Sequence, residues 1–222
     1  MIACIEPLTV DRRMERLLAA YMTAKENVIE AGFAAEIDWQ QRLDFDDITE
    51  QDLLRESAWV ILSAGMRETV VRVKFSAISR AFLDWVSARA IMHRSEQCRQ
   101  SSLSVFAHEG KTEAILFVAM IVSRMGFDKV RNHIKKEGVD YLQTFPYLGP
   151  ATAFHLAKNL GLNEVKPDRH LVRISERAGY SSADAMCKDI AEVVGDKEAV
   201  VDVVLWRYAT LNRNYLATFR RF

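Results

Sequence analysis

The stretch FPYLGPATAFHLAKNLGLNEVKPDRHLVRI, residues Phe145–Ile174, decides how the rest of the chain is interpreted. Three of the four prolines in the whole chain lie within it. Gly149-Pro150 separates two helical patterns, because glycine ends a helix readily and a proline at the first helical position loses no hydrogen bond. The stretch therefore predicts two helices joined by a short turn, followed by a third helix.

The helix after the turn begins with small residues, Ala151, Thr152 and Ala153. Small side chains leave the first backbone N–H groups open, at the end of the helix that carries a partial positive charge. Such a terminus can bind an anion, including a nucleic-acid phosphate, without regard to base sequence. An ordinary corner between two helices has the same pattern, so the turn alone leaves both interpretations open.

Asp168 follows Pro167, and a proline biases the residue before it, Lys166, towards an extended conformation. Asp168 is therefore expected at or near the N-cap of a helix that starts in DRHLVRISERAG. A capping aspartate has a purely structural role. A catalytic carboxylate at the same position is the alternative.

Helical periodicity dominates the rest of the chain, and no alternating strand pattern with hairpin turns occurs. Thr49 and Asp52 form a capping-box pattern at the start of one segment. The predicted helical segments are residues 10–32, 48–65, 67–92, 111–126, 127–138, 139–145, 149–161, 168–179, 182–195 and 196–211. The sequence thus predicts an all-α protein with short connections.

The composition is that of an ordinary soluble protein, with 222 residues of which 50% are hydrophobic. No stretch approaches the ~20 consecutive apolar residues of a membrane span, and the N-terminus lacks a secretory apolar region. Cys4, Cys98 and Cys187 lie far apart, without the spacing of a metal site. We expect reduced thiols in a cytoplasmic protein that holds no metal and does not enter a membrane.

Charge is distributed unevenly along the chain. Residues 1–60 carry 6 Lys and Arg against 13 Asp and Glu, a net charge of −7, and residues 61–222 carry +7. A polyanionic partner is therefore expected to bind the later part of the chain. Solvated helix faces explain the same asymmetry.

Two segments together resemble the helix-hairpin-helix DNA glycosylase superfamily, the relatives of endonuclease III and of the adenine and alkyl-purine glycosylases. Residues 145–153 read FPYLGPATA, like the family's hairpin, and residues 167–173 read PDRHLVR, like its aspartate segment. WVILSAGMRETVVRVKFSAI, residues 59–78, is similar to an upstream element. The resemblance implies a two-lobed all-α fold with an inter-lobe cleft. Residues 1–40 with 170–222 form one lobe, and residues 41–169, with the hairpin at about 139–161, form the other.

The resemblance also implies an activity. Asp168 matches the catalytic aspartate that stabilises an oxocarbenium-like sugar during hydrolysis of the N-glycosidic bond of a flipped base. The hairpin would hold the backbone of double-stranded DNA through main-chain groups. Its residues are Pro146, Tyr147, Leu148, Gly149, Ala151 and Thr152. A monovalent cation at the carbonyls of residues 145–149 is a further expectation from the family.

Several residues depart from the family pattern. Ala151 stands where bifunctional members have a nucleophilic lysine, and Lys158 lies about two turns further along the helix. The resemblance therefore implies a monofunctional enzyme with weak or absent strand cleavage. Tyr147 replaces the first hairpin glycine, which leaves open a changed turn or a ring lying against DNA. Only Cys187 lies where relatives have four cysteines, so no iron–sulfur cluster is expected.

Further roles follow from similarity of position. Met66 and Arg67 are expected to fill the space left by the flipped base, and Glu56 is a candidate polar contact to that base. The pocket for the base could draw on Trp59, Tyr147, Trp206 and Tyr208. Phosphate contacts are expected from Arg169 and Arg173, with Arg67, Arg72 and Lys74 as further neighbours. Core packing for the aromatic residues and Met66, and solvated helix faces for the charged ones, are the alternatives.

The sequence leaves the substrate open. An alkylated adenine, an oxidised purine, a mismatched base and an enzymatically modified base, including those of phage genomes, are all compatible with a monomeric glycosylase in repair or defence. A helix-hairpin-helix module that binds DNA structure without catalysis is the alternative function. An all-α protein that only imitates the two motifs is the third.

Overall fold

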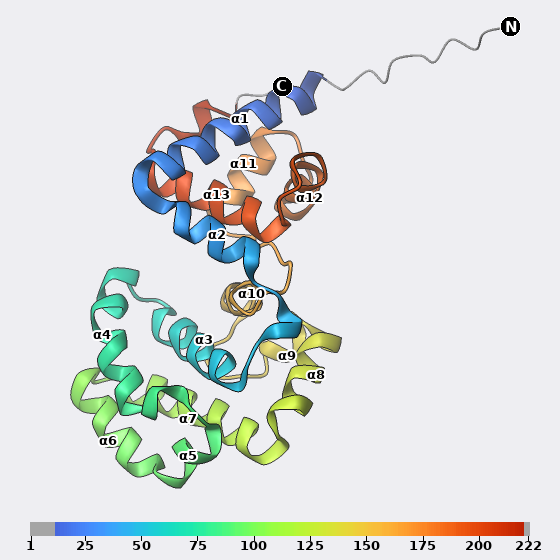
Figure 1. The fold of residues 1–222 in the computed structure, drawn as a ribbon. Helices are drawn as coiled ribbons and strands as arrows, with labels where there is room; N and C mark the ends of the chain where they lie inside the picture. Colours follow the sequence, from blue (N-terminus) through green and yellow to red (C-terminus); the bar gives the residue numbers. More distant parts are fainter. Residues whose placement is uncertain (1–11, 220–222) are drawn as a thin grey trace, which may run out of the picture. The chain divides into compact units, whose positions relative to one another are not determined.

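The computed structural model describes residues 12–219, and every regular element in that part of the chain is helical (Figure 1). The predicted all-α class is confirmed, with no strand among these residues. Backbone contacts divide the chain into two compact units. We call residues 12–41 with 165–219 the terminal unit, and residues 42–164 the central unit. Cys4 lies outside the described residues.

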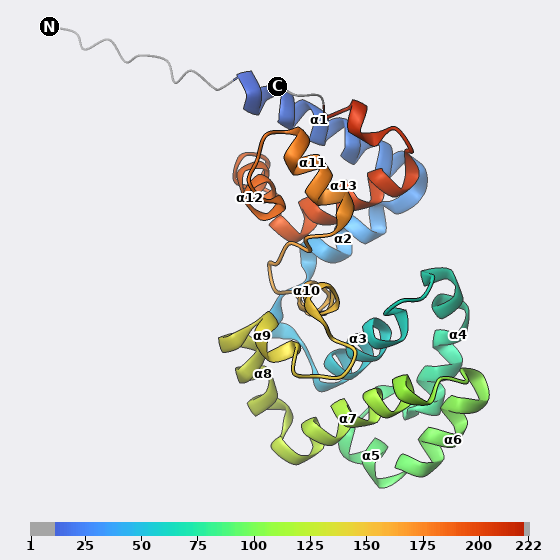
Figure 2. The same ribbon diagram turned by 180° about the vertical axis from the view of Figure 1, so that it is seen from behind.

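The terminal unit joins segments from the two ends of the described chain. Its helices are α1 (Arg12–Val28), α2 (Ala34–Arg42), α11 (Arg169–Arg177), α12 (Ala183–Val194) and α13 (Glu198–Leu211). Helix α1 packs along α13 over a shared apolar core (Figures 1 and 2). Tyr21 Oη donates to Asp196 Oδ2 at 2.6 Å and Lys25 Nζ lies 2.7 Å from the same oxygen, so polar contacts also tie α1 to the segment before α13.

The segment 165–168 belongs to the terminal unit, whereas the sequence assigned residues up to 169 to the central lobe. Val165 is buried in the core of the terminal unit. The Lys166 amide donates to Asp202 Oδ2 at 2.6 Å, and Asp202 on α13 is only 1% exposed. A buried carboxylate thereby anchors the chain immediately before α11, since a buried polar group needs a hydrogen-bond partner.

The central unit is built around one apolar helix. Its elements are α3 (Glu50–Ser63), α4 (Glu68–Ala81), α5 (Ala88–His93), α6 (Ser95–Val105), α7 (Glu109–Met125), α8 (Phe127–Glu137), α9 (Val139–Leu142) and α10 (Pro150–Asn159). Helix α7 packs against α3, α5, α6 and α8. Its run of Ala, Ile, Leu, Phe, Val and Met gives it apolar surface for all four neighbours.

Helix α3 begins where the capping box was predicted. The Asp52 amide donates to Thr49 Oγ1 at 3.1 Å, and the Thr49 amide donates to Asp52 Oδ2 at 3.1 Å. Two N–H groups at the helix start, which have no partner within the helix, are therefore satisfied by these side chains. The prediction of this helix start is confirmed.

The single helix predicted over residues 67–92 is wrong. Helix α4 ends at Ala81, and Leu83, Asp84 and Trp85 all adopt a left-handed conformation with φ of 57°, 49° and 63°. Each such residue costs about 1–2 kcal/mol. The turn buries the Trp85 ring, which stacks on Phe82 at 5.1 Å and donates from Nε1 to Ser79 Oγ at 2.9 Å. Aromatic burial and this hydrogen bond offset the backbone strain.

Two helices were not predicted, α2 and α6. Their sequences, AAEIDWQQR and SEQCRQSSLSV, contain few large apolar residues, so the period of 3.6 residues is hard to detect. Helix α6 buries the small residues Cys98 and Ser102 instead, and Ser102 Oγ lies 3.2 Å from Thr112 Oγ1 on α7. None of the helices formed by residues 12–219 is both long and apolar enough to span a bilayer.

Candidate functional site

The hairpin lies in the central unit, between α9 and α10. Phe145 and Leu148 are buried and hold the turn against the core, and the Leu148 amide donates to the Phe145 carbonyl at 3.2 Å. Thr152 Oγ1 donates to the carbonyls of Tyr147 at 3.0 Å and Gly149 at 3.1 Å. The side chain of Thr152 therefore braces the turn from within. The cation expected at the carbonyls of residues 145–149 stays a prediction.

The start of α10 exposes backbone donors. Gly149 and Ala151 are exposed, and their amides have no hydrogen-bond acceptor within residues 12–219. Pro150 at the first helical position has no N–H to satisfy. The positive end of the helix dipole points in the same direction as these amides. This arrangement can accept a phosphate oxygen through the main chain, although an ordinary helix start has the same open amides.

Tyr147 takes a left-handed conformation, with φ of 65°, that a glycine would adopt without strain. Its ring folds back onto the first turn of α7. The ring meets His108 edge to face at 6.0 Å between centroids. A Cβ at Gly110 would lie 2.5 Å from Tyr147 Oη, so only a glycine fits beneath the hydroxyl without a shift of the ring. The ring, which is 42% exposed, thus has a specific place on the protein surface.

Lys111 is the polar residue in this region that the sequence analysis missed. It is 2% exposed, and its Nζ donates to the carbonyls of Leu62 at 2.5 Å and Ala64 at 2.6 Å, at the end of α3. Burial lowers the pKa of Lys111. Nζ also lies 5.8 Å from the centroid of the Tyr147 ring. Lys111 therefore connects the end of α3 with the hairpin.

Met66 and Arg67 follow directly after the end of α3. Met66 is 36% exposed, and Arg67 is an exposed N-cap residue of α4 without a capping side chain. Gly65 before them has φ of 69°, a conformation that glycine adopts readily. Both side chains are thus available at the surface, as a role in filling a vacated base stack requires, but that role stays a prediction.

Two other candidates of the central unit make internal contacts. The Trp59 ring is partly buried and meets Phe75 edge to face at 5.1 Å. Glu56 accepts from Asn159 Nδ2 at 2.9 Å and from Arg55 Nε at 3.0 Å. Burial raises the pKa of Glu56, and Arg55 and Asn159 partly oppose this shift. Glu56 therefore joins α3 to α10, and the core interpretation accounts for Trp59.

The remaining basic neighbours are also engaged. Arg72 forms an ion pair with Glu68 and lies over the Trp59 ring at 5.7 Å. Lys74 Nζ donates to the Val105 carbonyl at 2.9 Å. These two cations have structural partners within the central unit, so a phosphate would compete with existing contacts.

Asp168 lies in the terminal unit as the N-cap of α11, and this part of the prediction is confirmed. Its Oδ1 accepts from the amides of His170 at 2.8 Å and Leu171 at 3.0 Å. Its Oδ2 has no hydrogen-bond partner among the described residues. The side chain is therefore held in one orientation by a single oxygen, which leaves the other oxygen of a half-buried carboxylate for another contact.

The residues around Asp168 differ in charge and burial. Arg169 and Arg173 are exposed on α11 and form no ion pair with a described residue. Desolvation lowers the pKa of His170, whose ring meets Tyr215 edge to face at 5.3 Å. Burial therefore favours the neutral form of His170, and the two arginines supply positive charge beside the carboxylate.

The two aromatic candidates of the terminal unit pack on its core, with Tyr208 buried and Trp206 partly buried. The Arg207 guanidinium lies 4.7 Å from the Trp206 ring centroid and pairs with Glu36 at 2.6 Å. Tyr208 is buried, and its Oη lies 2.7 Å from Thr218 Oγ1. The core interpretation accounts for both rings.

The predicted residues therefore form two groups. Asp168, Arg169 and Arg173 lie at the start of α11 in the terminal unit, whereas the hairpin, Met66 and Arg67 belong to the central unit. No cluster of three possible metal ligands occurs within residues 12–219. Comparison of the chain with family models, with curated proteins and with solved structures found no match.

Proposed function

We propose that the chain is a monofunctional DNA N-glycosylase that flips a damaged or modified base out of the duplex and hydrolyses its N-glycosidic bond. The observation that supports this most directly is the state of Asp168. Two amides of its own helix orient the carboxylate through Oδ1, and Oδ2 makes no hydrogen bond to a described residue. Capping occupies only Oδ1, so Oδ2 stays available for contact with a substrate.

Asp168 has a defined task in this reaction. The bond between C1′ and the base nitrogen breaks, its electron pair leaves with the base, and positive charge develops on the deoxyribose. A fixed carboxylate stabilises that charge and orients water for attack on C1′. The water proton passes to the carboxylate and then to solvent, and the departing base takes up a proton from solvent, so the products are an abasic site and a free base.

The hairpin supports DNA as the substrate. The open amides of Gly149 and Ala151 can bind phosphate without reading the base sequence. Ala151 has no amine with which to form a Schiff base, so the abasic strand is expected to remain intact. The base itself stays open among alkylated, oxidised, mismatched and enzymatically modified candidates.

A DNA-binding module without catalysis is the second candidate. The observation in its favour is the ordinary structural explanation of Asp168, whose two hydrogen bonds are those of a common N-cap. Under this proposal the hairpin amides bind a distorted duplex, and Asp168 serves only the start of α11.

Asp168→Asn distinguishes the two proposals. Asparagine caps helices as well as aspartate, so the fold is expected to persist. Genomic DNA from several sources is incubated with wild type and variant, and released bases are identified by mass spectrometry. We expect a modified base from the wild type and at least about a hundredfold less from the variant, with duplex binding unchanged or tighter. Binding without base release by the wild type favours the module, and absence of salt-dependent DNA binding excludes both.

A further inference from the structure

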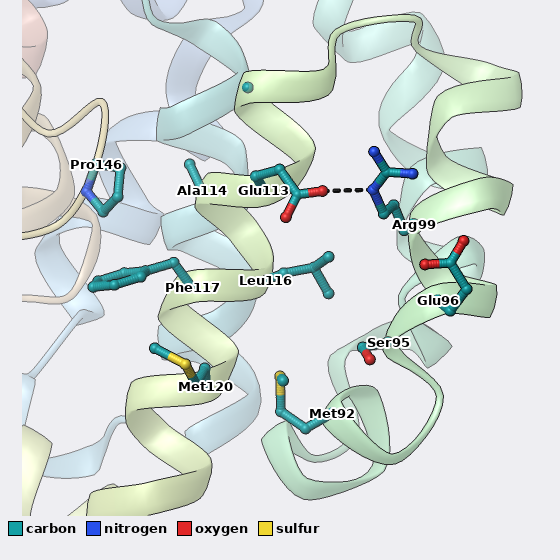
Figure 3. A pocket seen from close by; sticks show the side chains of 11 residues that line it. Met92, Ser95, Glu96, Arg99, Glu113, Ala114, Leu116, Phe117, Met120 and Pro146 are labelled. Carbon is teal, nitrogen blue, oxygen red and sulfur yellow. Dashed lines mark hydrogen bonds and ion pairs between the residues drawn. The ribbon is translucent and has the colours of Figure 1, made fainter.

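A groove lies along α7 within the central unit; Figure 3 shows side chains of α5 and α6 on one side of α7 and Pro146 of the hairpin on the other. It encloses about 630 Å³, within the size range of ligand-binding pockets. Most of its lining is apolar, and the side chains concerned are Met92, Ala114, Leu116, Phe117, Met120 and Pro146. We call this feature the α7 groove. Neither Asp168 nor the open amides of the hairpin line it.

The groove has the length and surface of a site for a helical segment. Its lining extends along α7 from Gly110 to Met120, about 15 Å at the rise of an α-helix. Ala114 has a small side chain, which allows close approach of another backbone, whereas the space beside Gly110 is occupied by the Tyr147 hydroxyl. Met92 and Met120 are flexible and can adapt to the side chains of a partner. An amphipathic helix binds such grooves through apolar residues on one face.

The rim of the groove carries an excess of negative charge. Arg99 is surrounded by glutamates, with its Nε 2.6 Å from Glu113 Oε1 and a second ion pair to Glu109 (Figure 3 shows the pair with Glu113). Hydrogen bonding to Glu113 and the charges of Glu109 and Glu96 raise the pKa of Arg99. Glu96 and Glu113 thus outnumber Arg99 in the lining, and Glu109 beside the groove adds a third carboxylate, so the rim carries a net negative charge.

The negative charge of the rim favours a positively charged partner. A nucleic-acid phosphate is repelled by a net negative rim, so the groove does not extend a DNA-binding surface. Residues 1–11 of the chain contain Glu6 and Asp11 but no Lys or Arg, so they lack the complementary charge. A segment with apolar residues on one face and Lys or Arg beside them satisfies both the floor and the rim.

We propose that the α7 groove is a docking site for a basic amphipathic helix of a partner protein. The apolar face of the partner covers Phe117 and Met120, and its cations lie beside Glu96 and Glu113. The site is separate from the proposed chemistry at Asp168, and a partner bound there contacts the hairpin through Pro146.

Two synthetic peptides of about sixteen residues test the docking site on the full chain. They share an apolar face, with leucine, methionine and phenylalanine, and differ in having lysine or glutamate at the polar positions. Fluorescence anisotropy of the labelled peptides gives both affinities. We expect the basic peptide to bind at least about tenfold more tightly than the acidic one. Equal binding of the two peptides, or binding of neither, overturns the proposal.

Charge reversal at the rim provides the decisive variant. Glu96→Lys with Glu113→Lys is expected to weaken binding of the basic peptide about tenfold and to strengthen binding of the acidic one. Glu137→Lys with Asp140→Lys makes the same charge change outside the groove and is expected to have little effect. If both double variants change the affinity for the basic peptide equally, only the net charge of the protein determines binding. That result refutes the docking site. All four positions are exposed, so unfolding is not expected.

Self-association is the remaining outcome, and it is measured on the same samples. Light scattering is expected to give a monomer that the basic peptide does not change. The protein could instead form a dimer that the basic peptide dissociates and that the Glu96→Lys, Glu113→Lys variant no longer forms. That result would assign the groove to a second copy of this chain and would overturn the proposed partner. None of these measurements uses DNA. A negative result for the docking site can therefore be distinguished from a negative result for the proposed glycosylase.

Discussion

The side chain of Tyr147 lies over Gly110, so the conformation of one residue depends on the size of the other. Tyr147 has φ of 65°, which costs a non-glycine residue about 1–2 kcal/mol. Its hydroxyl occupies the space where a side chain at Gly110 would begin, 2.5 Å from an added Cβ. The contacts of the ring with the first turn of α7 compensate for part of the backbone strain. The hairpin therefore keeps its left-handed position without a glycine.

This contact predicts that the effect of Gly110→Ala on the free energy of unfolding changes sign when Tyr147 is replaced by glycine. Gly110→Ala in the wild type is expected to destabilise by about 1 kcal/mol, because the Tyr147 ring must move. The same change in a Tyr147→Gly background is expected to stabilise by roughly 0.5 kcal/mol, because alanine is the better helix former. Urea unfolding measures all four proteins. Additive effects would show that the hydroxyl does not occupy this space in solution.

Lys111 stabilises the end of a whole helix, because its side chain binds the last carbonyls of α3. Its ammonium group donates to the carbonyls of Leu62 and Ala64, where the negative end of the helix dipole lies. The loop with Met66 and Arg67 starts immediately afterwards. The position of that loop therefore depends on a side chain from α7.

Lys111→Met is expected to destabilise the protein by about 1–3 kcal/mol, since two buried carbonyls lose their donor. Methionine keeps most of the apolar stem, so the loss reports the ammonium group. Urea unfolding gives the free energy, and hydrogen exchange of the Met66 amide is expected to accelerate. Lys129→Met, on the exposed face of α8, is the matched control and is expected to change neither quantity. An unchanged unfolding midpoint for Lys111→Met would contradict the assigned contact.

For the whole molecule, the net charge is zero, so the DNA binding that we propose would have to come from local groups. Arg169 and Arg173 are exposed and have no ion-pair partner among the described residues. If they contact phosphates, as proposed, Arg169→Ala with Arg173→Ala is expected to reduce the slope of log affinity against log salt by about 2. Arg124→Ala with Lys129→Ala is a control of equal charge, with an unchanged slope expected. Titrations at several salt concentrations measure both, and equal slopes for wild type and the first variant would exclude the phosphate contacts.

The sequence by itself determined the all-α class, the capping box of α3, the turn before Pro150 and the capping position of Asp168. Each of these depends on residues within a few positions of one another, so local chemistry is sufficient. The break at Leu83–Trp85 was not predictable in this way, because the burial of one tryptophan outweighs the local helical preference.

Only the tertiary structure decided which partners surround the candidate residues. Lys111 meets the carbonyl of Leu62, 49 positions away, and the Lys166 amide meets Asp202, 36 positions away. It also decided that Tyr208 is buried, that Trp59 and Trp206 pack partly buried against the cores, and that the Tyr147 ring lies on α7. Such contacts depend on how whole helices pack, and no short-range pattern in the sequence specifies that packing.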